Sequence, residues 1–426
     1  MEIILFGFVF LLLALFGTPL FIIFAAIALL CFYHAGISSS ATIIEMYRLA
    51  NAPALLAIPL FTFAGYLLSE SNTPRRLVNA SRALFGWLPG GLAIVTLVSC
   101  AIFTAFTGAS GVTIIALGGL LLPSLLSENY PERFSLGILT TSGSMGLLFP
   151  PSLPIILYGV VAQISIDKLF LAGFLPGLVM IGLLMIYSLY FGKKIHLPIV
   201  AFSWRNLGLA LREAIWEIPL PILIIGGIYG GLFTVTEAAA VTAVYAFIVE
   251  VFVYREIDLV HGVPRIMRAS MLLVGGILII LGTALGLTNY LIDAQIPMKI
   301  LHLMQLYFHS KIWFLVMLNL FLLIVGCMID IFSAIIVVVP LIIPVALSFG
   351  VNPIHLGIIF LSNLAIGYIT PPVGLSLFIA SFRFKKPIVQ LYLASLPFLL
   401  ILLVSLVIIT YVPDLSLWLV QLFSAP

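Results

Sequence analysis

Charged residues are scarce in this chain. Asp, Glu, Lys and Arg make up 8% of its 426 residues, whereas 63% are hydrophobic and the mean hydropathy is +1.31. Soluble globular domains carry about 25% charged residues, so the composition excludes an ordinary soluble protein. The 3 cysteines are scattered through apolar segments, and they indicate neither a disulfide framework nor a metal cluster. The composition therefore predicts a polytopic membrane protein.

Enzymatic motifs are missing as well. The sequence contains no H-E-x-x-H, P-loop or G-x-S-x-G pattern, and its 6 histidines show no ligand spacing. An intramembrane enzyme would need a paired nucleophile and base, or a metal set, and neither is found. We therefore expect no enzymatic activity, no ATP hydrolysis and no bound cofactor. The start Met1-Glu2 has no basic n-region, so we expect no cleaved signal peptide.

A six-residue pattern occurs twice, 221 positions apart, as Gly146-Leu-Leu-Phe-Pro-Pro151 and Gly367-Tyr-Ile-Thr-Pro-Pro372. Both copies lie in long apolar stretches. Because proline has no N–H, each Pro pair is expected to leave two carbonyls free, namely those of Gly146, Leu147, Gly367 and Tyr368. We expect membrane helices broken near the middle at 134–165 and 354–382, since non-helical backbone at membrane depth is tolerated where it lines an enclosed cavity.

The repeat extends beyond the Pro pairs. At the same offset, Leu120-Leu-Leu-Pro123 aligns with Leu341-Ile-Ile-Pro344, and Pro131 and Gly137 fall near Pro353 and Gly357. Chance does not often match several prolines and glycines in one order. The chain is therefore predicted to contain a duplicated unit.

Each unit is predicted to hold five spanning helices and one hairpin. The first unit, 1–195, has helices at 2–16, 19–33, 52–71, 134–165 and 170–191. The second, 216–426, has helices at 216–233, 237–254, 266–290, 354–382 and 388–412. One continuous first helix is the alternative, but it would be about 45 Å long against a hydrocarbon core of about 30 Å. Gly17-Thr18-Pro19 supplies stop and start signals that favour two short helices.

The segments 85–127 and 311–348 do not fit a simple span. Each has two apolar arms, around Thr107-Gly-Ala-Ser-Gly111 in the first and Gly326-Cys-Met-Ile-Asp330 in the second. We interpret both as re-entrant hairpins. The alternative is a pair of ordinary spans joined by a tight turn.

Lys and Arg favour the re-entrant interpretation. It places fourteen of the 18 basic residues inside and leaves Arg48, Lys168, Lys299 and Lys311 outside. Five crossings per unit is an odd number, so the two units are predicted to form an inverted repeat. Residues 196–215 between them are expected to form a cytoplasmic amphipathic connector lying in the membrane interface. A plain polar linker is the alternative.

Asp330 is the clearest candidate for chemistry, because an acidic group at bilayer depth is costly and by default a functional candidate. It lies at the second tip, where turns and unwound helices supply carbonyl oxygens for a cation such as sodium. A solvated loop carboxylate is the alternative. By contrast, Glu237 follows Thr236 in a pattern typical of a helix start, and we favour that structural role.

The first tip carries hydroxyls in place of a carboxylate. Ser110 and the carbonyl of Gly146 would form a second cation site, and Thr107 would face the substrate; the alternative for this tip is a packing face of small residues. Other candidate substrate contacts flank the breaks, although any hydroxyl among them could instead bond its own helix. These contacts are Ser142, Ser144, Pro150, Pro151, Ser152, Thr370, Pro371 and Pro372. Helix N-termini at the tips and breaks suit a carboxylate substrate.

These motifs resemble the large membrane subunit of the tripartite ATP-independent periplasmic (TRAP) transporters, the DctM-type family of the ion-transporter superfamily. The resemblance covers nearly the whole chain. It rests on Gly230-Gly-Leu-Phe-Thr-Val-Thr-Glu-Ala-Ala-Ala240, Thr370-Pro-Pro-Val-Gly374, Phe149-Pro-Pro-Ser152 and the first tip. Two positions depart from the family pattern, since Val235 stands where proline is usual and the first tip has fewer serines.

The resemblance implies a sodium-driven elevator-type importer in the bacterial inner membrane, with scaffold and transport domains. A periplasmic binding protein would deliver an organic acid anion, such as a C4-dicarboxylate or sialic acid, and a small four-helix membrane subunit would complete the complex. By position, one sodium site would include Ser110 and Gly146. The other would include Gly326, Asp330, Gly367 and Thr370. The alternative is a stand-alone ion-coupled anion carrier or antiporter of the same superfamily.

Overall fold

The chain folds into an all-helical membrane protein. The computed structural model describes residues 10, 12–13, 16, 18–38, 40–195, 201–296, 298–299, 302 and 310–423, and no strand occurs among them. In the first half the helices are α2 (Leu20–His34), α3 (Ser40–Ala50), η1 (Pro53–Leu56), α4 (Ala57–Glu70), α5 (Thr73–Phe85), α6 (Gly91–Thr107), α7 (Ser110–Ser127), α8 (Glu132–Ser142), η2 (Met145–Leu148), α9 (Leu153–Ala162) and α10 (Ile166–Lys194).

The second half has a similar series. After α11 (Trp204–Glu213) come α12 (Pro219–Tyr229), α13 (Val235–Ile248), the π-helical turn η3 (Val249–Val253), α14 (Gly262–Asp293), α16 (Lys311–Met328), α17 (Ile331–Ser348), α18 (Pro353–Gly367), α19 (Leu375–Phe384), α20 (Ile388–Tyr411) and α21 (Asp414–Phe423).

Most predicted segments coincide with helices to within a few residues. The segment 170–191 is α10, 266–290 is α14, and both broken helices are interrupted at their Pro pairs. The predicted helix 2–16 lies almost wholly outside the described residues. The connector contains α11, whose N-cap Ser203 accepts a hydrogen bond from the N–H of Asn206, so a plain polar linker is ruled out there. The sequence analysis missed α3, α5 and α21 because it searched for spanning segments.

Eight described helices are long and apolar enough to cross a membrane, or up to nine if the bent pair α8–α9 counts as one span. The segments flanking the first Pro pair meet at 44°. Since α7, α16 and α17 are each long enough to cross, length does not distinguish re-entrant hairpins from ordinary spans. Re-entry of the hairpins and the inverted orientation of the two units therefore stay predictions.

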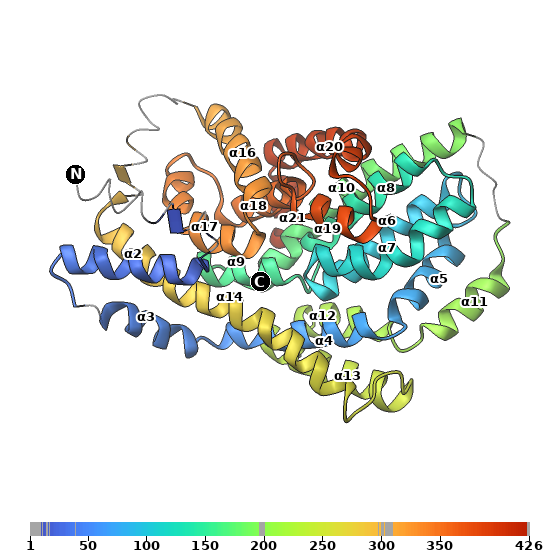
Figure 1. Ribbon diagram of the computed structural model, residues 1–426, viewed down its shortest axis with the longest axis horizontal. Coiled ribbons are helices and arrows are strands. Elements are labelled where there is room, and N and C mark those ends of the chain that lie inside the picture. Colours follow the sequence, from blue (N-terminus) through green and yellow to red (C-terminus); the bar gives the residue numbers. More distant parts are fainter. Residues whose placement is uncertain are drawn as a thin grey trace.

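The helices form two layers, and each layer takes helices from both halves (Figure 1). In the lower layer α2, α3 and α4 pack on α14, and α4 also packs on α13. The upper layer contains both hairpins and both broken helices. Its contacts between halves are reciprocal: α7 of the first hairpin packs on α19, and α17 of the second packs on α9. Hairpins and broken helices thus form one packed body.

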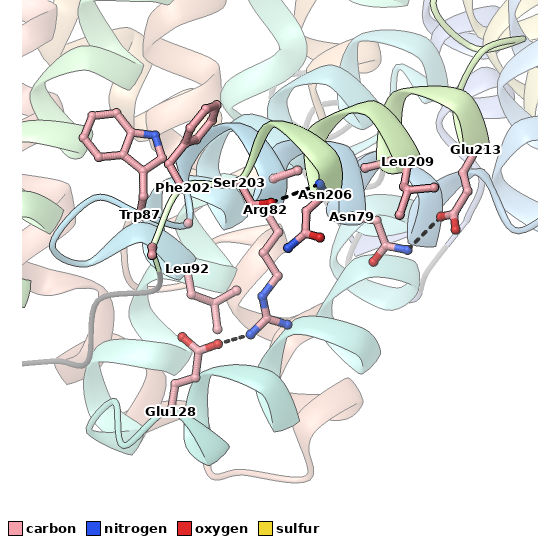
Figure 2. A pocket seen from close by; sticks show the side chains of 14 residues that line it. Asn79, Arg82, Trp87, Leu92, Glu128, Phe202, Ser203, Asn206, Leu209 and Glu213 are labelled. Atoms are coloured by element: carbon pink, nitrogen blue, oxygen red, sulfur yellow. Dashed lines mark hydrogen bonds and ion pairs between the residues drawn. The ribbon is translucent and has the colours of Figure 1, made fainter.

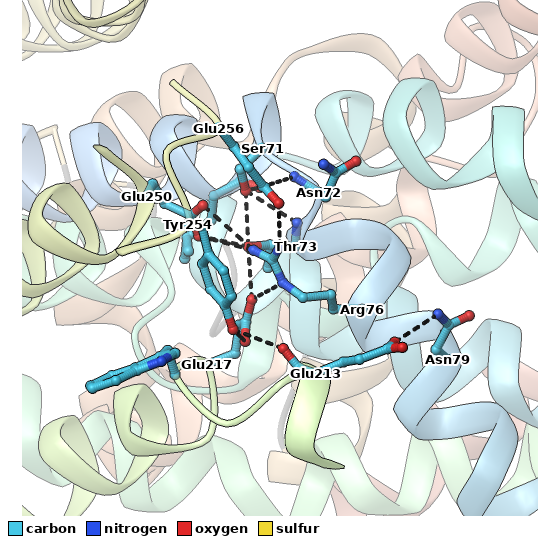
Figure 3. A network of polar contacts seen from close by, with 12 residues as sticks. Ser71, Asn72, Thr73, Arg76, Asn79, Glu213, Glu217, Glu250, Tyr254 and Glu256 are labelled. Atoms are coloured by element: carbon cyan, nitrogen blue, oxygen red, sulfur yellow. Dashed lines mark hydrogen bonds and ion pairs between the residues drawn. The ribbon is translucent and has the colours of Figure 1, made fainter. Parts of the chain in front are cut away.

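A buried charged cluster joins the two halves (Figure 3). Arg76 on α5 donates from Nε to Glu217, from Nη1 to Glu256 at 2.6 Å, and lies 3.4 Å from Glu250 through Nη2. Its guanidinium carbon lies 3.8 Å from the centroid of the Tyr254 ring. We call these five residues the Arg76 hub. One cation of the first half thus gathers three carboxylates of the second.

Burial makes the loss of a single charge from the hub costly in free energy. The side chains of Arg76, Glu217 and Glu250 are 9%, 5% and 0% exposed. Burial by itself lowers the pKa of Arg76, but Glu217 and Glu250 outweigh it and raise the pKa above its usual value, so the guanidinium stays charged. Removing one partner of a buried ion pair costs about 3–5 kcal/mol because it leaves uncompensated charge.

We predict that Arg76→Gln lowers the stability of the purified protein by about 3–5 kcal/mol, because three carboxylates, two of them buried, lose their only cation in the hub. The measurement is the thermal unfolding midpoint in detergent. Arg75→Gln is the matched control, since Arg75 is exposed on the same helix. Equal midpoints for the two variants would contradict the role assigned to the hub.

Candidate functional site

The first hairpin contacts the first helix break through its α6 arm and its tip, where a Cβ at Gly108 would stand 2.5 Å from the Leu153 side chain. After α8, residues 145–148 form a short 3-10 turn, the Pro150–Pro151 peptide is cis, and α9 begins at Leu153. The Thr104 hydroxyl, on α6, donates to the Gly143 carbonyl at 3.0 Å. Gly146 lies against the α6 backbone, where a Cβ would stand 2.2 Å from the Ala101 carbonyl oxygen. Only glycine fits this close approach.

The second tip meets the second break in the corresponding way. Gly326 and Gly367 are in backbone contact, and a Cβ added at Gly367 would stand 2.5 Å from the Gly326 carbonyl carbon. The Gly374 N–H donates to the Cys327 carbonyl at 3.0 Å, and the Pro371–Pro372 peptide is also cis. In each half, therefore, the tip of the hairpin packs directly on the break of its own half.

The prediction that the Pro pairs leave carbonyls free needs correction. The N–H of Phe149 donates to the Gly146 carbonyl at 3.1 Å, and that of Thr370 donates to Gly367 at 2.9 Å. The Tyr368 carbonyl accepts from Ser376 at 3.0 Å. The prediction was wrong for these three groups, because 3-10 bonds and the restarting helix replace the donors that proline lacks. Each carbonyl keeps a second lone pair for a ligand.

Asp330 caps the helix that restarts after the second tip. Its Oδ2 accepts from the Ser333 N–H at 3.0 Å, and the neighbouring Ile331 N–H donates to the Tyr368 hydroxyl at 2.8 Å. The sequence analysis weighed a cation ligand against a loop carboxylate and missed this N-cap role. A carboxylate has about four lone-pair sites, so capping leaves oxygen capacity for a cation.

Four predicted contact residues bond their own helices; this was the alternative for Ser142, Ser144 and Thr370, whereas the alternative for Thr107 was a packing face. The hydroxyls of Thr107, Ser142, Ser144 and Thr370 donate to the carbonyls three or four residues earlier, at 2.9–3.3 Å. These hydroxyls keep acceptor capacity only. Glu237 forms a capping box with Thr234 at the start of α13, which confirms the structural role favoured for it.

Other polar groups at the breaks have no partner. Seven buried side-chain polar atoms of the described residues lack a hydrogen bond, and five of them belong to the two broken helices. These five are on Thr141, Ser152, Ser362, Asn363 and Ser376. A buried unsatisfied polar group costs about 1–3 kcal/mol, which a ligand or water would recover. The clustering makes the broken helices the candidate region for a polar ligand.

Only Ser152 of these five was predicted. It is the N-cap of α9, yet its hydroxyl does not cap the helix, and the residue is fully buried. The repeat offered a signal for two others, because Thr141 and Ser362 align at the offset of 221, and both have unpaired hydroxyls. A polar side chain that recurs at equivalent positions beside both Pro pairs is the pattern to search for.

Several cavities among the described residues lie away from the tips. Four of them have volumes of about 300–460 Å³, and none of these four is lined by any of the fourteen predicted site residues. The one in Figure 2 lies between α5, α11 and the end of α7. We place the candidate site at the tips and breaks because unpaired polar groups gather there, whereas volume alone gives no chemistry.

The site depends on the contact between Gly326 and Gly367, which leaves no room for a side chain. We predict that Gly367→Ala lowers the free energy of unfolding by about 1–3 kcal/mol through overpacking strain, which is measured as a lower thermal unfolding midpoint. Gly226→Ala on α12 is the control, because its Cβ meets open space and alanine favours the helix. A Gly367→Ala protein as stable as the Gly226→Ala protein would refute the packing argument.

Comparison with known proteins agrees with the resemblance seen in the sequence motifs. The family model described as the tripartite ATP-independent periplasmic transporter, DctM component, matches residues 6–415. The C4-dicarboxylate TRAP transporter large permease protein DctM of Pseudomonas aeruginosa is 37% identical over 394 residues, which are 92% of this chain and 91% of that protein. The ectoine/5-hydroxyectoine TRAP transporter large permease of Ruegeria pomeroyi is 33% identical and covers 96% of both chains.

A solved structure shares the fold. The Alcanivorax borkumensis YdaH transporter superposes with a TM-score of 0.61 at 17% identity, covering 90% of this chain and 88% of that chain. The relatives compared above are named as permeases, in agreement with the prediction that the chain is not an enzyme.

Proposed function

Because the chain belongs to the DctM component family of the TRAP transporters, we propose that it is the membrane-translocating subunit of a sodium-coupled tripartite importer for an organic acid anion. A periplasmic binding protein would deliver the substrate, and a small four-helix subunit would complete the complex in the bacterial inner membrane. C4-dicarboxylates are the first candidates, since relatives more than 35% identical over most of this chain are named for them. Another relative is named for ectoine, so ectoine is a further substrate to test.

The observation that carries the proposal is the pairing of hairpin tips with unwound helix breaks. Two breaks, two tips and five unpaired polar atoms lie in one body built from both halves. Broken helices in corresponding halves of a secondary transporter mark its binding site. Reciprocal packing of α7 on α19 and α17 on α9 supports movement of this body as a unit, as an elevator requires.

Sodium would bind where oxygen atoms converge at the tips. One cation site would use Asp330, Thr370 and the carbonyls of Gly326 and Gly367. The other would use Ser110, which is buried, and the Gly146 carbonyl. A bound cation would offset the charge of an anionic substrate, so that the loaded body passes the apolar layer more easily than the partly loaded one.

We predict that Asp330→Asn weakens sodium binding at least tenfold while leaving the fold intact. Asparagine is as good an N-cap as aspartate, so the change removes the charge and keeps the cap. The measurement is the rise in thermal midpoint with NaCl, compared with KCl at equal ionic strength, because a ligand stabilises the state it binds. Glu237→Gln is the control, since that carboxylate caps a helix away from the tips. A wild-type sodium response in Asp330→Asn would refute the assignment.

We predict that Ser152→Ala preserves or raises stability and lowers uptake. Removing an unpaired buried hydroxyl relieves a desolvation cost, but it also removes a substrate contact. Uptake is measured in proteoliposomes that contain both partner subunits. A panel of C4-dicarboxylates is first tested with the wild type, and the acid that the wild type accumulates is then used for the variants. Ser395→Ala is the control, because its unpaired hydroxyl lies on α20, outside the broken helices. Equal uptake by the two variants would remove Ser152 from the site.

A further inference from the structure

Helix α5 is held in different ways at its two ends. Its first turn carries Thr73 and Arg76, which are buried in the hub with the carboxylates of the second half. Its last turn carries Arg82, which donates to Glu128 at the end of α7 in the first hairpin. The Arg82 and Glu128 side chains are 49% and 24% exposed, so salt screens this pair far more than the hub.

Helix α5 also bonds to α11. Asn79 donates to the Glu213 carboxylate at 3.4 Å, and the two helices pack together. Just after α11 the chain reaches Glu217, a member of the hub. The α5–α11 pair is therefore fixed to the second half at the first turn of α5 and through the short segment that runs from α11 to Glu217.

The side of this pair that faces the first hairpin is loosely filled. A cavity of about 360 Å³ separates α11 and the end of α5 from the hairpin base, and Figure 2 shows Arg82 crossing it to reach Glu128. A second cavity, of about 300 Å³, lies between apolar side chains of α5, α6 and α12, including Leu77, Ile102 and Ile222. Helix α5 also packs on α6 of this hairpin, so the exposed ion pair crosses a cavity that lies beside a packed contact.

We propose that the α5–α11 pair is a fixed brace and that Arg82–Glu128 is a releasable tether holding the hairpin base against it in one conformation. When the hairpin body moves, the ion pair opens and the hairpin base leaves the brace, while the Arg76 hub stays closed. Arg82 is a positioning residue that sets the balance between two conformations and does not touch the substrate. The inference rests on the movement of the hairpin body in the proposed function, and it adds that the Arg82–Glu128 contact is the one that breaks.

The test measures the distance between the hairpin and the brace with spin labels in lipid nanodiscs. One label is placed at Leu126→Cys on α7, which is exposed, and the other at Gly208→Cys on α11, where a side chain meets open space. The three native cysteines are replaced by alanine. A second pair, Arg75→Cys on α5 and Val244→Cys on α13, both exposed positions, reports whether the hub keeps α5 at a fixed distance from α13.

We expect Arg82→Gln and Glu128→Gln each to lower the ratio of short to long distances roughly two- to fivefold, the range of an exposed ion pair. The exchange Arg82→Glu with Glu128→Arg should restore the ratio, and 1 M salt should act like Arg82→Gln. The control Arg75→Gln should change nothing in the first pair, and the second pair should keep a single distance throughout.

An unchanged ratio in Arg82→Gln would overturn the tether, and a second distance between α5 and α13 would overturn the brace. A single hairpin distance under all conditions would also overturn the inference. The sodium-dependent thermal midpoint of the wild type tests the proposed function separately, so a failed tether and a failed sodium coupling give different results.

Discussion

Backbone polar groups at membrane depth have no water to bond, so a break in a membrane helix must be covered by protein. Here each break is covered by the tip of the hairpin from its own half. The close approach requires glycine, since a Cβ at Gly146 or Gly367 would overlap the opposing backbone. The Phe149 and Thr370 amides then satisfy carbonyls that the Pro pairs would otherwise leave unbonded. Tip and break thus depend on each other.

The satisfied backbone contrasts with the unsatisfied side chains around it. A half-bonded polar network inside a protein is less favourable than an apolar one, so unpaired hydroxyls at Thr141, Ser152, Ser362 and Ser376 carry a cost. This cost is repaid when a ligand supplies the missing partners. Protein stability and ligand affinity are then coupled at the same atoms, and an empty site is less stable than a loaded one.

The sequence predicted features that depend on local punctuation. The helix breaks, the hairpin arms and the glycine-containing tips follow from prolines and glycines within a few residues of each other. The Arg76 hub could not be predicted in this way, because the partners of Arg76 lie 141, 174 and 180 residues along the chain. Asp330 falls between these cases. Its position at a tip was predicted, but capping by its carboxylate depends on where α17 begins, which the apolar run 331–348 does not reveal.

The charge at the tips gives a physical reason for the proposed ion coupling. In the tips and breaks, residues 107–111, 143–152, 326–330 and 367–374, Asp330 is the one acidic residue, and no Lys or Arg is present. An organic anion entering there meets helix N-termini, hydroxyls and a carboxylate of its own sign. Helix N-termini each supply only about half a positive charge, shared with the caps already on them. Because like charges repel strongly where water is excluded, the anion gains more from a cation beside Asp330 than from the hydroxyls alone. Sodium would thus be a condition for substrate binding as well as a source of energy, and this reasoning makes the Asp330 carboxylate the most informative single group in the site.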